Sequence, residues 1–165
     1  MTPFFSTPER VAALRTVAER WVKTPFAPGG TAVCGRRGGA SCHRLVIAIE
    51  AEAGVPWGQE EVADAPLNRA AHHHGSLMAE WLRSHGDRFA EISAAAGELA
   101  DVVQPGDVLL IRHGIGIHHA AAALDRGEII QTLQGIGAHI VQPVERKQRQ
   151  RLWAVFRPLV SQIEI

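Results

Sequence analysis

Apolar residues in the first third of the chain recur every three or four positions, which is the spacing of one face of an α-helix. One such stripe follows Thr7-Pro8-Glu9, a cap with proline at the first helical position, and ends before Thr24-Pro25. A second begins after Ser41 and ends at Gly54. Its apolar face consists of Leu45, Val46, Ile49 and Ala53. The pattern predicts two amphipathic helices here.

The middle of the chain, from 55 to 104, has a weaker pattern. Apolar positions predict a helix over 67–85 and a shorter one over 93–102. We interpret this stretch as a helical insertion that shapes a cleft. Because 165 residues suffice for one core and are few for two, we expect one domain over 1–165.

After Pro105-Gly106-Asp107 the pattern changes to short apolar or alternating runs separated by turn residues, which is typical of antiparallel strands. The runs predict five strands, over 108–112, 117–124, 128–133, 139–142 and 152–157. The basic run 146–151 is interpreted as a solvated connection between the last two. Helices followed by an antiparallel sheet make an α+β fold.

The overall charge excludes some classes of partner. Seventeen basic residues balance seventeen acidic ones, and the pI is about 7.1. A neutral chain has no general cationic field for a nucleic acid backbone. No run of 18 apolar residues predicts a membrane-spanning helix. We therefore expect neither nucleic acid binding nor membrane insertion.

Cys42 directly follows the cap Ser41, after a loop of glycine and arginine at 35–39. The N–H groups of a first helical turn and the positive end of the helix dipole favour an anion, so a thiol there is shifted towards the nucleophilic thiolate. A catalytic cysteine is one interpretation, and a small buried side chain is the other. We expect Cys34 to be a loop or packing residue, and both thiols to be free.

A nucleophilic thiolate needs a base, and the base needs an orienting partner. His119 lies in the predicted strand 117–124, and Gln131 lies in the strand that returns. If the hairpin turns about Asp125, His119 stands opposite Gln131 with both side chains on one face. The spacing therefore predicts a His–Gln pair.

Two alternatives to this pair stay open. A bulge at Gly127 would shift the register by one residue, and His118 or Thr132 would then take these places. Because neighbouring strand residues point to opposite faces, only one of His118 and His119 can serve.

Three consecutive histidines, 72–74, raise the possibility of a metal site. Consecutive helical residues point about 100° apart, so three in a row do not converge on one ion from a regular helix. We interpret them as a solvated helix face and expect neither metal nor cofactor.

Taken together, these residues resemble the NlpC-type cell-wall peptidases, papain-like cysteine endopeptidases that cut the peptide stems of peptidoglycan. The resemblance runs through most of the chain as an ordered set of motifs. The matching segments are Trp21…Thr24-Pro25-Phe26…Gly29-Gly30, Gly39…Cys42…Leu45-Val46, Pro105-Gly106-Asp107-Val108-Leu109-Leu110 and His119…Leu124…Gly127…Ile130-Gln131. The resemblance implies a papain-like α+β fold, in which a helix with the nucleophile at its N-terminus packs on an antiparallel sheet of about five strands.

The resemblance also implies roles for individual residues. Cys42 is the nucleophile, His119 the base and Gln131 the orienting residue, in acyl transfer to the thiol and then to water. The backbone N–H of Cys42 supplies part of the oxyanion hole. The residues expected at the substrate are Phe26, Ser41, His43 and His118. For His43 the alternative is an exposed second residue of the helix.

Around the nucleophile the sequence departs from the family pattern. Ser41-Cys42-His43-Arg44 replaces the usual Asp-Cys-Ser-Gly, and Phe26 stands where the family often has a tyrosine. Two other functions therefore stand beside the endopeptidase: a catalytically degenerate member that acts as a structural tail-tip component, and a cytoplasmic papain-like amidase.

The first nine residues show neither a basic n-region nor an apolar h-region, so we expect synthesis in the cytoplasm without a signal peptide. Peptidoglycan stem peptides lie outside the cytoplasmic membrane. The segment 155–158 is similar to phage tail-associated members of the family. We therefore expect the protein to be carried on the tail of a phage-like or gene-transfer particle, with tail-tip proteins as partners.

Overall fold

The computed structural model describes residues 1–28, 32–56, 76–95, 97–114, 116–141 and 146–160, without the side chains of 116–118 and 146–148. Two helices come first. α1 (Pro8–Trp21) has Thr7 as its N-cap, and the Thr7 side chain accepts a hydrogen bond from Arg10 N at 3.4 Å. α2 (Cys42–Glu52) has Ser41 as its N-cap. Both helices confirm the sequence prediction.

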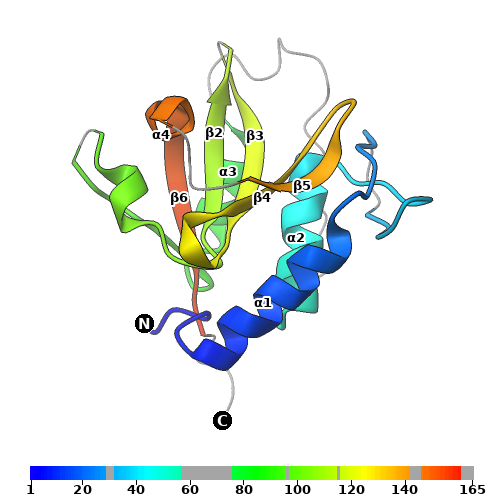
Figure 1. Cartoon of the computed structure of the whole chain (residues 1–165). Helices are drawn as coiled ribbons and strands as arrows, with labels where there is room; N and C mark the ends of the chain where they lie inside the picture. Colours follow the sequence, from blue (N-terminus) through cyan, green and yellow to red (C-terminus); the bar gives the residue numbers. More distant parts are fainter. Residues whose placement is uncertain (29–31, 57–75, 96, 115, 142–145, 161–165) are drawn as a thin grey trace.

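The strands of the described chain form one six-stranded antiparallel sheet in the order β1-β6-β2-β3-β4-β5 (Figure 1). The strands are β1 (Phe89–Glu91), β2 (Val108–His113), β3 (Gly116–Ala123), β4 (Ile129–Leu133), β5 (Gly137–Val141) and β6 (Leu152–Pro158). The α+β class is confirmed. All five predicted strands form, and β1, which the sequence analysis did not predict, adds a sixth by pairing with the outer edge of β6.

The segment 55–104, predicted to be helical, contains a strand as well as helix. Helix α3 (Leu77–Ser84) falls within the predicted 67–85, of which 67–75 lie outside the described residues. The helix predicted over 93–102 is wrong, since the described residues of this range contain no α-helix and form the 3-10 turn η2 (Leu99–Val102). Gly97 has a φ of +86°, and this left-handed conformation interrupts any helix across it.

The basic run before β6 forms the short helix α4 (Arg146–Arg151), in which residues 149–151 are exposed, as expected of a solvated connection. The turn between β3 and β4 is the 3-10 segment η3 (Asp125–Gly127). Phe4 N donates to Pro158 O at 2.8 Å and ties the start of the chain to the end of β6.

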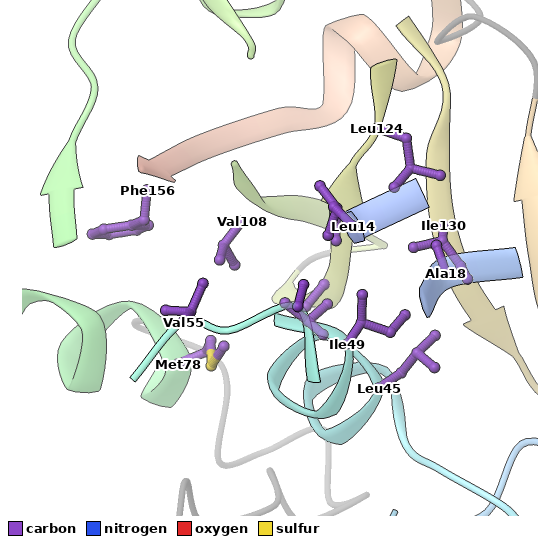
Figure 2. Packing of buried hydrophobic residues seen from close by; sticks show 14 of the residues in the cluster. Leu14, Ala18, Leu45, Ile49, Val55, Met78, Val108, Leu124, Ile130 and Phe156 are labelled. Carbon is purple, nitrogen blue, oxygen red and sulfur yellow. The ribbon is translucent and has the colours of Figure 1, made fainter. Parts of the chain in front are cut away.

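Apolar side chains bury both faces of the sheet. Figure 2 shows Leu14 and Ala18 of α1, Ile49 of α2 and Ile130 of β4 among the residues of the larger core. On the helix side the sheet contributes Val108, Leu110, Ala120, Ala122, Ile130 and Phe156. A second cluster, on the opposite face by alternation, contains Leu109, Ile111, Ala121, Ala123, Ile129 and Val155. The larger core holds α2 against β3 and β4.

Candidate active site

Cys42 is the first residue of α2 and is half-buried. The cap residue Ser41 is extended, and its side chain accepts a hydrogen bond from Arg44 N at 3.4 Å. N–H groups of a first helical turn point out of the N-terminal end of the helix, towards any group that the thiol attacks.

The loop before α2 is fixed by close backbone packing. Val33 and Gly39 exchange backbone hydrogen bonds at 3.0 and 2.8 Å. A Cβ at Gly38 would lie 1.8 Å from Val33 O, and one at Gly39 would lie 2.6 Å from the Cβ of Ala27. Only glycine fits these two positions, so the loop can hold the N-terminus of α2 in one place.

His119 of β3 and Gln131 of β4 are joined by a hydrogen bond between His119 Nε2 and Gln131 Oε1, at 2.8 Å. Both side chains are buried, with 7% and 5% exposed. The structure therefore brings together the two residues that the hairpin spacing had paired.

The geometry of that hairpin differs from the prediction. The strands pair at Ala122–Ile130 and Ala123–Ile129, so the turn is centred on Arg126 and not on Asp125. Arg126 and Gly127 both have positive φ, at 59° and 72°, which makes the turn longer. In this register Gln131 is a diagonal neighbour of His119.

Within the described residues the β3–β4 ladder has no further pair beyond Ala122–Ile130. The β4–β5 hairpin swings away from β3 in Figure 1. The His119–Gln131 hydrogen bond therefore bridges the place where the two strands diverge. Because an even shift in register keeps a side chain on its face, the predicted pair meets although the predicted register is wrong.

A third residue, His139 of β5, extends this pair. It stands directly opposite Gln131 in the β4–β5 ladder. Its Nε2 lies 3.2 Å from Gln131 Nε2, and its Nδ1 lies 2.8 Å from the carbonyl oxygen of Gly137. The sequence interpretation placed His139 in a strand and missed its contact with Gln131.

The residues expected at the substrate lie in different settings. Phe26 is half-buried and forms a backbone bridge with Ala40, just before α2. Ser41 acts as the helix cap. His43 is 4% exposed, so the prediction of an exposed second helical residue is wrong. His118 lies in β3, and its side chain is outside the described part of the structure.

Cys34 and Cys42 are not joined in a disulfide, as expected from the sequence. Cys34 Sγ lies 3.3 Å from the carbonyl oxygen of Arg20, at the end of α1. In the described ranges, no three His, Cys, Asp or Glu residues gather as metal ligands, and the histidines 72–74 lie outside those ranges. The helices of the described chain are all too short or too polar to span a membrane.

A second buried polar cluster joins the start of β2 to β6. Arg157 donates to Asp107 from Nε to Oδ1 at 2.8 Å and from its terminal NH2 to Oδ2 at 2.7 Å. Gln104 N adds a third hydrogen bond to this carboxyl at 2.8 Å. Burial raises the pKa of Asp107 above its ordinary value, and the hydrogen bonds from Arg157 and Gln104 oppose that rise.

No family model and no curated protein matches the sequence. Solved structures do match it. A lipoprotein-like protein of the NLP/P60 family from Staphylococcus aureus subsp. aureus Mu50 has a TM-score of 0.60 and 16% identity over 97% of this chain, which spans 45% of that protein. The NlpC/p60 domain of the peptidoglycan hydrolase SagA has a TM-score of 0.51 and 17% identity over 88% of this chain and 96% of that domain. At these identities the likeness shows a shared fold.

Proposed function

We propose that the chain is a cysteine hydrolase that cuts the stem peptides of peptidoglycan. The observation that carries this proposal is the buried hydrogen bond between His119 and Gln131, on the two strands against which the helix of Cys42 packs. A fold shared with the NlpC/p60 domain of a peptidoglycan hydrolase supports the substrate class.

The proposed reaction is an acyl transfer in two steps. The Cys42 thiolate, formed when the thiol proton passes to His119, attacks the carbonyl carbon of a peptide bond. The backbone N–H of Cys42 donates to the developing oxyanion. His119 then protonates the leaving amine as the C–N bond breaks. In the second step His119 takes a proton from water, which attacks the thioester and releases Cys42.

The proposal requires Cys42 and His119 to meet at the diverging ends of the strands. His119 continues the alternation of Ala121 and Ala123, which lie on the face away from α2. The thiol would therefore reach the imidazole around the strand ends, and not across the packed face of the sheet.

The pairing of Cys42 with His119 has a direct test. The measurement is the rate of Cys42 alkylation by iodoacetamide as a function of pH, in a Cys34→Ala background. We expect this rate to rise at a pH well below about 8.5, the ordinary pKa of a cysteine thiol. In His119→Ala the rise should move to a pH closer to that ordinary value. An unchanged alkylation profile in His119→Ala would show that the two groups do not interact.

Digestion of purified peptidoglycan tests the activity. Wild-type protein should release stem-peptide fragments that mass spectrometry identifies, and Cys42→Ala should release none. Cys34→Ala is the matched control, because it removes the other free thiol and should retain activity. Absence of fragments from folded wild-type protein, with slow alkylation of Cys42, would overturn the proposal and favour a structural role.

Carriage on a phage-like or gene-transfer particle is a separate proposal, and it rests on the sequence expectations alone. Its test is detection of the protein in purified particles by immunoblotting. Protein that is found in cells and never in particles would contradict it.

A further inference from the structure

Three buried or half-buried side chains on three successive strands form a single hydrogen-bonded series that ends on a backbone carbonyl. The series runs from His119 Nε2 to Gln131 Oε1 at 2.8 Å, from Gln131 Nε2 to His139 Nε2 at 3.2 Å, and from His139 Nδ1 to Gly137 O at 2.8 Å. We propose that His139 is a positioning residue that acts through Gln131 to fix the tautomer of His119. This inference rests on the proposed role of His119 as the base.

The carbonyl oxygen of Gly137, at the end of the series, determines which group donates and which accepts in each of its hydrogen bonds. A carbonyl oxygen only accepts hydrogen bonds, so His139 Nδ1 must carry a proton and donate it to Gly137 O. In the neutral imidazole Nε2 is then an acceptor, and the group it faces on Gln131 must be the amide NH2. The amide oxygen of Gln131 consequently faces His119. That oxygen accepts from His119 Nε2, which must carry the proton.

The tautomer of His119 matters for catalysis because only one ring nitrogen can accept the thiol proton. With Nε2 protonated and bonded to Gln131, Nδ1 holds the lone pair. A Gln131 amide turned by 180° would present its NH2 to Nε2, and the proton of His119 would move to Nδ1. His119 would then be unable to take a proton from Cys42 through that nitrogen.

The Gly137 carbonyl is well placed to set this direction because its strand is held on both sides. Gly137 faces Leu133 in the β4–β5 ladder. On the other side, Ala138 N donates to Thr24 O at 2.7 Å, and Lys23 N donates to Ala138 O at 2.8 Å. The segment that follows α1 therefore fixes the start of β5, and with it the acceptor at the end of the series.

Two substitutions separate the two hydrogen bonds of His139. In His139→Asn the side-chain amide can still donate to Gly137 O, at the place of Nδ1, but it does not extend to Gln131. In His139→Gln the longer side chain can accept from the NH2 of Gln131, at the place of Nε2, while the bond to Gly137 is lost. A purely structural role through Gly137 predicts that Asn is tolerated and Gln is not. The positioning role predicts that neither is tolerated, because the tautomer of His119 is fixed only when His139 both donates to Gly137 O and accepts from Gln131.

The decisive measurement is ¹⁵N NMR of the His119 ring at about pH 8 in a Cys42→Ala background, where no thiol can pass its proton to the ring and neutral imidazole predominates. In that background the ring should show one tautomer, with the proton on Nε2, while His139 is present, and a mixture of both in His139→Asn and in His139→Gln. The kcat for peptidoglycan cleavage, measured with Cys42 intact, should fall about three- to tenfold in both variants, with little change in KM. In a Gln131→Ala background, His139→Asn should have no further effect.

A single unchanged tautomer in either variant would overturn the inference. The NMR readout needs no peptidase activity. If wild-type protein does not cut peptidoglycan, the proposed function fails, and the tautomer measurement still decides whether His139 positions His119.

Discussion

The two buried polar clusters of the sheet, Asp107–Arg157 and His119–Gln131–His139, are built in opposite ways. The first is an ion pair with two parallel hydrogen bonds, completed by a backbone N–H. The second is formed by neutral groups that can each donate and accept, and it ends on one carbonyl oxygen. An ion pair has only one arrangement of donors and acceptors, whereas a neutral series has two and needs an anchor to select one.

This difference indicates different tasks. The Asp107–Arg157 pair connects β2, β6 and the segment before β2, since Arg157 also donates to Val102 O at 2.9 Å. The hydrogen bonds of this pair hold these three segments together. If His119 is the base that we propose, the neutral series sets where its proton resides, which is a requirement of catalysis and not of folding.

The largest effect on stability should come from breaking the ion pair on one side. Asp107→Leu leaves the Arg157 charge buried without its partner, and we expect the free energy of unfolding to fall by about 3–5 kcal/mol. Urea denaturation followed by circular dichroism measures the change. Because burial raises the pKa of Asp107, desolvation outweighs the attraction in this pair.

The double variant Asp107→Leu/Arg157→Met therefore provides the control. It removes both charges, and it should recover most of the lost stability. A double variant that is no more stable than Asp107→Leu would show that the ion pair itself, and not the unpaired charge, accounts for the loss.

Breaking the neutral series should instead affect the reaction. In Gln131→Ala the His119 ring loses its orienting acceptor, and we expect kcat for peptidoglycan cleavage to fall by about 100-fold or more. Truncating a buried hydrogen-bonded side chain should also lower stability by about 1–3 kcal/mol. Activity is measured by the rate of fragment release at saturating peptidoglycan.

Thr132→Val is the matched control for Gln131→Ala. Thr132 is the next residue of β4, is equally buried, and its Oγ1 makes no hydrogen bond within the described residues. The sequence left Thr132 open as the orienting residue in a shifted register. A loss of activity in Thr132→Val as large as in Gln131→Ala would revive that alternative.

The anchor of the neutral series can be disturbed by adding one methyl group. Gly137 has a φ of +83°, and its Cβ would lie 2.7 Å from Thr24 O. Gly135 has a similar φ of +81° with nothing within 4 Å of the same position. Alanine at either site is strained by about 1–2 kcal/mol. At Gly137 the close contact adds about 1 kcal/mol or more.

We therefore expect Gly137→Ala to be less stable than Gly135→Ala in thermal unfolding, and to lower kcat a few-fold as the carbonyl moves. Gly135→Ala should keep the wild-type kcat. Equal stability and equal kcat in the two variants would mean that the position of the Gly137 carbonyl has little influence on the site.

Much of the fold could be predicted from the sequence because its elements carry their own signals. Thr7 and Ser41 are N-caps, and apolar periodicity continues through both helices. β1 has no such signal, since three residues are too few for alternation to be seen. It is a strand because it pairs with β6, which is a long-range contact.

The site was predictable to the extent that hairpin geometry is local. Counting about Asp125 paired His119 with Gln131, although positive φ values at Arg126 and Gly127 shift the register. The same counting about Gly135, in the next hairpin, places His139 opposite Gln131, and it could have found the third member. The distance from Cys42 to the sheet depends on helix packing, which no local pattern determines.

The smallest effect should come from an ion pair at the surface, between Arg83 and Glu91. Arg83 donates to the two oxygens of Glu91 at 2.8 and 2.6 Å, and this lowers the pKa of Glu91 below its ordinary value of 4.5. A carboxyl with a lowered folded-state pKa contributes stability above its unfolded pKa, and that contribution is lost as the pH falls through the folded pKa. Both side chains are more than 40% exposed, so screening limits the contribution to about 0–1 kcal/mol.

Glu91→Gln should therefore lower the free energy of unfolding by less than about 1 kcal/mol at pH 7 and leave it unchanged at roughly pH 2, where Glu91 is protonated in both states. Urea denaturation at the two pH values measures this difference. Glu80→Gln is the control, because Glu80 acts on Arg83 only through its charge. If Glu91→Gln lost as much stability as Asp107→Leu, burial would not determine how much an ion pair contributes to the stability of this protein.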